Sequence, residues 1–149
     1  MTGHNPTDRG KLGTKRHIIT DKNGIPLSTF ITSANTHDVT VAIDTVDRIV
    51  INRPSSKPKH KQKKQNLCLD KAYHSKYVEQ EIIKRGYIPH IRHRREERIF
   101  HRKYPARRWV VERTNSWHNR FRKLFTRYEK KDENYLGLVQ LANKLSIIS

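Results

Sequence analysis

Hydrophobic and polar positions follow two different periods along the first third of the chain. Two segments rich in β-branched residues, 16–21 and 25–32, flank the dipeptide Asn23-Gly24, which favours a tight hairpin turn because both residues tolerate positive φ. Apolar side chains then recur at the spacing of a helix face over residues 39–51. Residues 1–14 are rich in Gly, Pro and Thr and follow neither period, so we expect an extended lead-in without regular structure.

The central part of the chain alternates short apolar segments with an amphipathic one. Residues 66–69 predict a short apolar strand that ends at Asp70, and residues 76–85 predict a helix that stops at a glycine. Residues 87–91 predict an edge strand, because Pro89 has no N–H to donate to a neighbouring strand.

Two helices are predicted at the C-terminal end, over about 106–127 and 135–148. On a helical wheel the first of them separates an apolar face from a polar face. The apolar face carries Val110, Trp117, Phe121, Leu124 and Phe125, and the polar face carries Arg108, Glu112, Ser116, Asn119 and Lys123. The last helix has an apolar stripe typical of core packing: Leu136, Val139, Ala142 and Leu145. The order of strands and helices predicts one mixed α/β domain over 15–149.

The charge of the chain changes this picture most. The chain has 32 Lys and Arg against 14 Asp and Glu, which gives a formal net charge of +18. Such a balance favours a polyanionic partner, because neutralising phosphates and releasing their counterions drives binding. The single cysteine excludes an intrachain disulfide and a cluster of zinc thiolates. The start of the chain has no apolar signal region, and no apolar run approaches the ~18 residues that span a bilayer, so we expect no membrane partner and a cytoplasmic location.

Two stretches, near 52–66 and 92–105, are predicted to be basic loops. The first contains two prolines and no acidic residue after its first arginine, and its later lysines are Lys61, Lys63 and Lys64. One interpretation is a solvated linker. The other is a loop that lies along a phosphate backbone, which would make these lysines DNA contacts.

Two carboxylates are candidates for chemistry. Asp70 follows an apolar strand, and the C-terminal ends of strands in open α/β sheets are where ligands bind; the structural alternative is an Asx turn. Glu112 is one of only four acids among 17 Lys and Arg between Lys84 and Lys131. Its structural alternative is an ion pair with Arg108, one helical turn earlier. Together the two acids suit phosphodiester chemistry, in which two Mg²⁺ ions about 3.5–4 Å apart are held by carboxylate oxygens.

Several separated motifs carry a family resemblance, in order from about residue 5 to residue 145. They are Asn5-Pro6-Thr7-Asp8-Arg9-Gly10-Lys11, Gly13-Thr14-Lys15-Arg16-His17, Ala34-Asn35-Thr36-His37-Asp38, Asp70-Lys71-Ala72-Tyr73, Arg108-Trp109-Val110-Val111-Glu112-Arg113-Thr114, and then Trp117, Asn119, Arg120 and Phe121. This series resembles the IS4/IS5-type insertion-sequence transposases, in particular their IS5-like branch.

The resemblance implies a fold, a site and a partner. The implied fold is an RNase H-like mixed sheet flanked by helices, and the implied site is a DDE triad that binds two divalent metal ions, Mg²⁺ or Mn²⁺. Asp70 matches the second acid of the triad and Glu112 matches the third. The implied partner is double-stranded DNA, at transposon ends and at the target, in the bacterial nucleoid. The expected DNA contacts are Arg108, Arg113, Asn119, Arg120, Lys123, Lys61, Lys63 and Lys64.

The sequence departs from the family pattern at two places. The Tyr-Arg-Glu-Lys signature would place a tyrosine at Pro105 and a lysine at Asn119; Arg108 keeps its place, and Lys123 is a candidate substitute for the lysine. The first Asp of the family lies on a strand before the Asn-Pro-Thr-Asp-Arg-Gly segment, so we expect this chain to lack that strand and that carboxylate. Asp38, beside His37, is expected to approach the site without replacing the first acid.

Three functional hypotheses remain open from the sequence. The first is the C-terminal part of a DDE transposase that cleaves and transfers DNA strands, either truncated or frameshifted and inactive alone. It would act as a homodimer or with the missing N-terminal half. The second is a non-catalytic DNA-binding fragment that regulates or inhibits full-length transposase. The third, a ribosomal-type RNA binder, accounts for the charge but not for the motifs.

Overall fold

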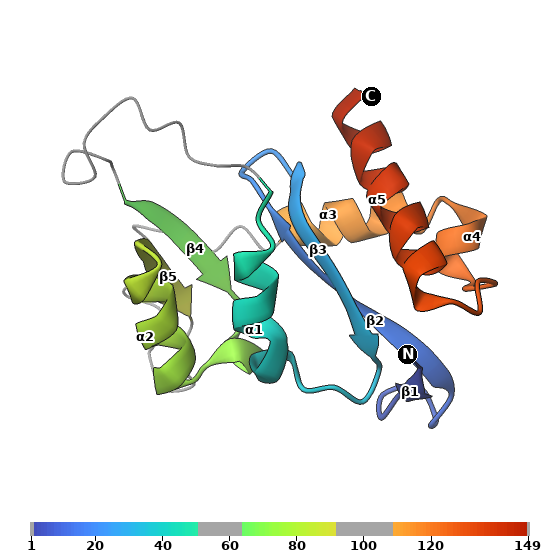
Figure 1. Cartoon of the computed structure of the whole chain (residues 1–149), viewed down its shortest axis with the longest axis horizontal. Coiled ribbons are helices and arrows are strands. Elements are labelled where there is room, and N and C mark those ends of the chain that lie inside the picture. Colours follow the sequence, from blue (N-terminus) through green and yellow to red (C-terminus); the bar gives the residue numbers. More distant parts are fainter. Residues whose placement is uncertain (1, 51–63, 92–108, 149) are drawn as a thin grey trace.

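The computed structural model describes residues 2–50, 64–91 and 109–148 (Figure 1). The β2–β3 hairpin runs through the middle of the molecule, with α1, α2, β4 and β5 on one side and α3, α4 and α5 on the other. The elements are β1 Gly3–His4, β2 Leu12–Thr20, β3 Pro26–Ser33, α1 Asp38–Asp47, β4 Gln65–Leu69, η2 Lys71–Tyr73, α2 Lys76–Lys84, β5 Tyr87–Ile91, α3 Trp109–His118, α4 Arg122–Phe125 and α5 Asp132–Ile148. The predicted mixed α/β class is confirmed.

The predicted hairpin is present, and its turn is held by a side chain. β2 and β3 pair antiparallel, with Arg16 opposite Ile31. The carboxylate of Asp21 accepts hydrogen bonds from the backbone N–H groups of Asn23 and Ile25, both at 2.8 Å. Gly24 has a φ of 87°, a conformation that glycine adopts without steric cost.

The lead-in contains regular structure, contrary to our expectation for residues 1–14. β1 pairs with the start of β2, which begins at Leu12 rather than at Arg16. The intervening turn closes through a hydrogen bond from the Asn5 N–H to the Lys11 carbonyl at 2.8 Å. A Cβ at Gly3 would lie 2.3 Å from Oδ1 of Asn35, so glycine permits this close approach.

β4 and β5 form a second, separate sheet. They run parallel, with Leu67 opposite Pro89, and α2 connects them. Within the described residues, this two-stranded sheet is not hydrogen-bonded to the three-stranded sheet of β1, β2 and β3. The family resemblance implied one mixed sheet, and the described strands form two.

The prediction of one continuous helix over about 106–127 is wrong, because two helices, α3 and α4, form the described part of this segment. α3 ends at His118, and a tight turn follows in which the N–H groups of Arg120 and Phe121 bond to the carbonyls of Trp117 and His118, both at 3.1 Å. α4 is a separate short helix. The last helix begins at Asp132 rather than at Tyr135. Residues 106–108, the predicted start of the long helix, lie outside the described residues.

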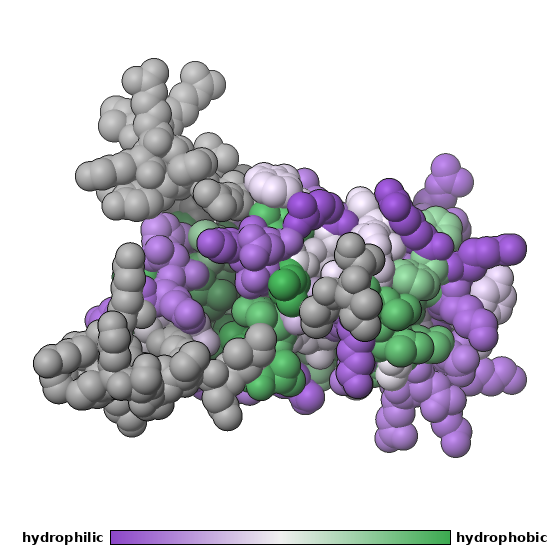
Figure 2. All heavy atoms as spheres, turned by 90° about the horizontal axis from the view of Figure 1, so that it is seen from above, coloured by the Kyte–Doolittle hydropathy of each residue, from purple (hydrophilic) through white to green (hydrophobic). Residues whose placement is uncertain are grey.

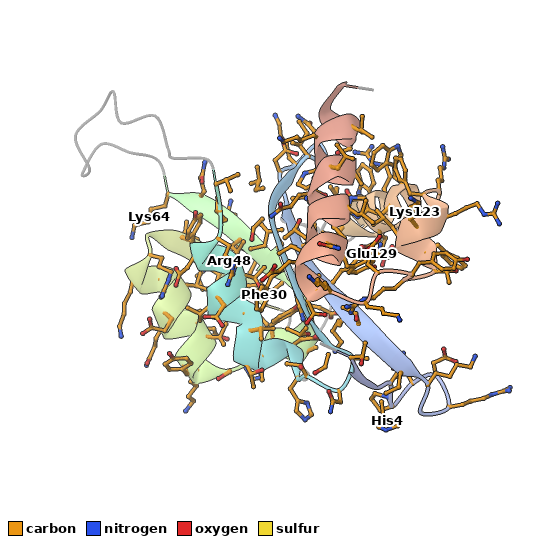
Figure 3. The ribbon with its side chains drawn as sticks, turned by 45° about the vertical axis from the view of Figure 1, so that its right-hand side comes forward. His4, Phe30, Arg48, Lys64, Lys123 and Glu129 are labelled. Atoms are coloured by element: carbon orange, nitrogen blue, oxygen red, sulfur yellow. The ribbon has the colours of Figure 1, made fainter. Side chains whose placement is uncertain are left out.

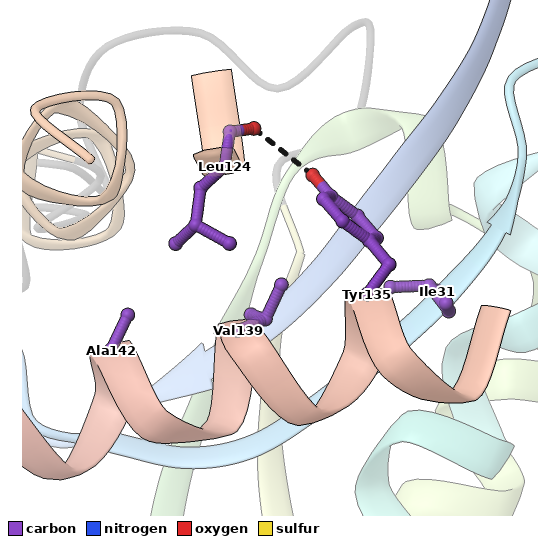
Figure 4. Packing of buried hydrophobic residues seen from close by; sticks show 5 residues of the cluster. All are labelled: Ile31, Leu124, Tyr135, Val139 and Ala142. Carbon is purple, nitrogen blue, oxygen red and sulfur yellow. Dashed lines mark hydrogen bonds between the residues drawn. The ribbon is translucent and has the colours of Figure 1, made fainter. Parts of the chain in front are cut away.

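Each side of the molecule has its own hydrophobic cluster. The first, the α4–α5 cluster, joins β3, α4 and α5 through Ile31, Leu124, Tyr135, Val139 and Ala142 (Figure 4). In it the Tyr135 hydroxyl donates to the Leu124 carbonyl at 3.1 Å, which gives both buried polar groups a partner. The second, the α1–α2 cluster, joins α1, β4 and α2 through Ala42, Val46, Leu67, Val78 and Ile82.

The break before α4 also changes which aromatic and aliphatic side chains are buried. Trp117 and Phe121 pack against the α4–α5 cluster, as predicted for a core face. Phe125 was predicted on the same face but is 71% exposed, and Leu145 is 41% exposed. A continuous helix would keep positions 117, 121 and 125 in line, whereas the turn at 119–121 rotates α4 relative to α3.

Among the described residues, none of the helices combines the length and the apolar character that a membrane-spanning segment needs.

Candidate active site

Asp70 lies at the C-terminal end of β4, where the sequence predicted it. The strand ends one residue earlier, at Leu69, which packs against the α1–α2 cluster. The backbone then turns into η2, with the Tyr73 N–H donating to the Asp70 carbonyl at 3.0 Å. Asp70 itself is half-buried.

Tyr73 links Asp70 to a second carboxylate. Its ring packs against the cluster formed by α1, β4 and α2. Burial, together with the negative charges of Asp38 and Asp70, raises the pKa of Tyr73 to about 12. Both carboxylates are therefore close enough to act on one phenol, which keeps its proton at neutral pH.

Asp38 is held by two residues of β2. The Lys15 ammonium donates to the Asp38 carboxylate at 2.9 Å and to the Thr36 carbonyl at 3.0 Å. His17 Nδ1 lies 3.9 Å from the same carboxylate, and its Nε2 pairs with the Thr32 hydroxyl at 2.9 Å. Burial lowers the pKa of His17, and the Asp38 charge partly opposes that shift. Asp38 thus approaches the Asp70 region, as expected, but as the partner of a lysine.

Asp38 and the loop after Asp70 also share a cleft. Its lining includes Lys15, Asn35, His37, Asp38 and Ala72. The loop that follows β3 and the loop that follows β4 therefore meet at one place on the surface.

Glu112 lies in the first turn of α3, and its side chain is exposed. The buried residues of this helix are Val110, Thr114 and His118, spaced one turn apart on another face. Glu112 therefore projects from an exposed face, as the helical wheel predicted. Its suggested ion-pair partner, Arg108, lies outside the described residues.

Arg113, a predicted DNA contact, has partners inside the protein. Its guanidinium donates to the Asn23 carbonyl and lies over the Trp109 ring, 5.2 Å from the ring centroid. The indole of Trp109 is itself 53% exposed, which agrees with its position off the apolar face.

The other predicted DNA contacts that the structure describes are exposed: Lys64, Asn119, Arg120 and Lys123. Asn119 accepts a hydrogen bond from Arg16 at 2.7 Å. Lys64 and Lys123 lie on opposite sides of the molecule, so these residues do not form one patch (Figure 3). Hydrophilic side chains project densely from the end that carries α4 (Figure 2). Lys61, Lys63 and nearly all of the two predicted basic loops lie outside the described residues.

Sequence reasoning missed the burial of His118. His118 is 0% exposed, and neither ring nitrogen has a hydrogen bond that meets normal geometry. Burial, together with the Arg16 charge, lowers the pKa of His118 to about 4, and the Asn143 side chain partly opposes this shift. The signal for burial was its position, four and eight residues after Thr114 and Val110 on one helix face.

The donor set at the candidate site consists of carboxylates and suits a hard cation. No group of three or more His, Cys, Asp and Glu side chains comes together within residues 2–50, 64–91 and 109–148. Mg²⁺, however, is commonly held by only one or two protein carboxylates, with water and substrate phosphate completing its six positions. Asp70 and Glu112 have the carboxylate oxygens that such a coordination shell requires.

The chain is thus a mixed α/β domain with a net charge of +18, an acid after a strand and an acid on a late helix. The comparisons identify the family: residues 2–142 match the model of the Transposase DDE domain, and the chain belongs to this family. A putative transposase for insertion sequence element IS402 from Burkholderia cepacia is 38% identical over 146 residues, which cover 94% of this chain and 65% of that relative. The chain thus spans less than two thirds of the relative's length. No solved structure matches it.

Proposed function

We propose that this chain carries two of the metal-binding carboxylates of an insertion-sequence transposase, Asp70 and Glu112, and acts on double-stranded DNA. The observation that carries the proposal is the position of the two acids within a chain of the DDE transposase family: one directly follows β4 and the other is exposed on α3. The net charge of +18 supports a polyanionic substrate.

The residues of this chain have separable roles in the proposed reaction. Bound Mg²⁺ or Mn²⁺ would activate the attacking hydroxyl and stabilise the leaving oxygen at a phosphodiester. Asp70 and Glu112 would hold the ion from two different elements. Exposed cations beyond them, Arg120 and Lys123 on the described surface, would bind phosphates and set the position of the duplex.

We propose further that β2–β3 and β4–β5 belong to one RNase H-like sheet in the assembled protein. The first strand of that sheet and the first aspartate would come from an N-terminal part of a longer transposase or from a partner chain. The relative is longer than the region it shares with this chain, which supports a larger functional unit.

A second candidate function is a DNA-binding regulator of full-length transposase. No three acids come together within the described residues, and a product that only binds DNA would not need a complete metal site. Such a product would occupy transposon ends without cutting them.

A strand-cleavage and strand-transfer assay with Mg²⁺ tests these candidates. We expect any metal-dependent cleavage by the chain to be abolished in Asp70→Asn and in Glu112→Gln. The matched controls are Asp44→Asn and Glu133→Gln, two exposed acids on α1 and α5. Wild-type protein that binds DNA but never cleaves it would favour the regulator. Cleavage that survives in Asp70→Asn would refute the proposed site.

A further inference from the structure

The turn of the β2–β3 hairpin contacts α3 directly beside Glu112. The Thr114 hydroxyl donates to the Gly24 carbonyl at 2.9 Å, and the Arg113 guanidinium donates to the Asn23 carbonyl. These bonds join residues that are 90 positions apart in the chain. Thr114 is 4% exposed, so the contact is shielded from water.

The turn is built to present its carbonyl groups to the helix. The Asp21 carboxylate accepts hydrogen bonds from the N–H groups of Asn23 and Ile25, and the backbone N–H of Asp21 donates to the Ile25 carbonyl at 2.9 Å. A Cβ at Gly24 would lie 2.7 Å from Nη2 of Arg113 and 3.3 Å from Oγ1 of Thr114. Any larger residue would therefore displace the arginine and press on the helix.

Thr114 also ties the helix to itself. Its hydroxyl lies 3.1 Å from the carbonyl of Val110, a residue that is 3% exposed. The Val110–Thr114 face is thus the one that packs on the hairpin, and Glu112 lies on a different, exposed face of the same turn of helix. At the far end of α3, the Arg16–Asn119 hydrogen bond forms a second link to β2.

We propose that Thr114 and Arg113 are positioning residues for Glu112: by fixing α3 to the hairpin turn, they set where the Glu112 carboxylate lies relative to Asp70. This inference rests on the proposed function. It gives Arg113 an internal role in place of the predicted phosphate contact. Residues that orient metal-binding side chains typically contribute about 10–100-fold to metal affinity, because small displacements of a ligand weaken binding.

Mn²⁺ binding by the full chain, followed by electron paramagnetic resonance, tests the positioning role. We expect Thr114→Val, which keeps the shape and loses the hydroxyl, to weaken Mn²⁺ binding about 10-fold or more. Thr114→Ser should restore the affinity. Lys22→Ala, which changes an exposed side chain of the same turn, should leave it unchanged. Arg113→Met, at a more exposed position, provides a second test and should also weaken Mn²⁺ binding. Circular dichroism at the assay temperature checks that each variant is folded.

The outcomes separate this inference from the proposed function. If Glu112→Gln weakens Mn²⁺ binding but Thr114→Val and Arg113→Met do not, the positioning role is wrong and the metal site stands. If Glu112→Gln leaves Mn²⁺ affinity unchanged, the proposed function fails. If Mn²⁺ binding is weakened by Glu112→Gln and also by Thr114→Val and Arg113→Met, and Thr114→Ser restores the affinity, both proposals are supported.

The salt dependence of DNA binding tests the role of Arg113 separately. Each phosphate contact contributes about 0.9 to the slope of log K against log salt. We expect Arg120→Met to lower that slope by about this amount and Arg113→Met to leave it unchanged. An equal loss of slope in both variants would show that Arg113 contacts phosphate and would overturn its internal role.

Discussion

The two candidate carboxylates lie on two sides of the molecule that are stabilised differently. Asp70 belongs to the side formed by α1, β4, α2 and β5, whose core is a cluster of aliphatic side chains. Glu112 belongs to the side formed by the hairpin and α3, α4 and α5. There the cluster is accompanied by buried polar groups, among them His118 and Thr114.

This difference affects how each acid is positioned. Asp70 directly follows Leu69, so a short apolar strand packed between α1 and α2 is sufficient to place it. Glu112 depends on contacts between segments far apart in sequence, such as Thr114 with Gly24 and Asn143 with Thr29, the latter at 2.6 Å. We therefore expect the Asp70 side to respond mainly to lost apolar volume and the Glu112 side to lost hydrogen bonds and to pH.

The largest effect is expected from Ile82→Ala. Ile82 is 0% exposed in the α1–α2 cluster, and truncating a buried isoleucine costs about 2–5 kcal/mol, from lost transfer energy and the cavity that remains. The matched control is Ile83→Ala. Ile83 follows Ile82 in the chain and is 55% exposed, so this substitution should change the free energy of unfolding by no more than about 0.5 kcal/mol. Urea unfolding measures both. Equal losses in the two variants would contradict the position of this core.

The next effect is a pH dependence specific to the Glu112 side. The pKa of His118 is lowered to about 4 in the folded protein, against 6.5 for an ordinary histidine. The unfolded chain binds a proton first, so stability is complete above pH 6.5 and is lost as the pH falls toward 4.

The expected loss from His118 is about 3 kcal/mol over this range. The free energy of unfolding, measured between pH 7 and pH 4, should fall less steeply in His118→Gln than in the wild type. Identical pH profiles for the two proteins would show that His118 is not buried in its neutral form.

A smaller effect distinguishes the hairpin turn from a turn with no helix against it. Gly24→Ala and Gly10→Ala both place alanine at positive φ, 87° and 70°, at a cost of about 1 kcal/mol. Nothing lies within 4 Å of a Cβ at Gly10, whereas at Gly24 the Arg113 side chain must give up its bond to Asn23. Thermal unfolding should therefore show about 1 kcal/mol of additional loss for Gly24→Ala. Equal losses would mean that the turn does not hold α3.

The smallest effect is expected from the ion pairs of Arg85 on the Asp70 side, one with Asp47 and one with Glu81 at 2.7 Å. Arg85 donates to both carboxylate oxygens of Asp47, at 2.6 and 2.9 Å, and this holds the pKa of Asp47 below its usual range. Because the Asp47 side chain is 52% exposed, Arg85→Met should cost only about 0.5–1 kcal/mol at low salt and less at high salt. Lys76→Met on the same helix is the control. A salt-independent loss would indicate lost packing instead.

Local signals in the sequence predicted the Asp70 side well. The apolar strand before Asp70, the helix over α2 and the edge strand with Pro89 were all identified within a residue or two. The hairpin turn was equally clear, because Asn23-Gly24 has a strong conformational preference of its own. In each case a few adjacent residues contain the physical cause.

The Glu112 side was harder to predict because its structure depends on distant contacts. Nothing adjacent to Asn119 signals a helix break; the break accompanies the packing of Leu124 beneath Tyr135 and the bond from Arg16 to Asn119. The burial of His118 and the internal partners of Arg113 likewise need the folded hairpin. The pairing of β1 with β2 was missed for the same reason, since it relies on the space that Gly3 leaves for Asn35.

The most direct test of the central claim is a double-mutant cycle on Mn²⁺ affinity with Asp70→Asn and Glu112→Gln. If the two acids hold the same ion or ion pair, each single variant weakens binding. The double variant then loses less than the product of the two losses, because interacting sites are not additive. Losses that multiply independently, or an affinity that neither substitution changes, would contradict the assignment of Asp70 and Glu112 to one metal site.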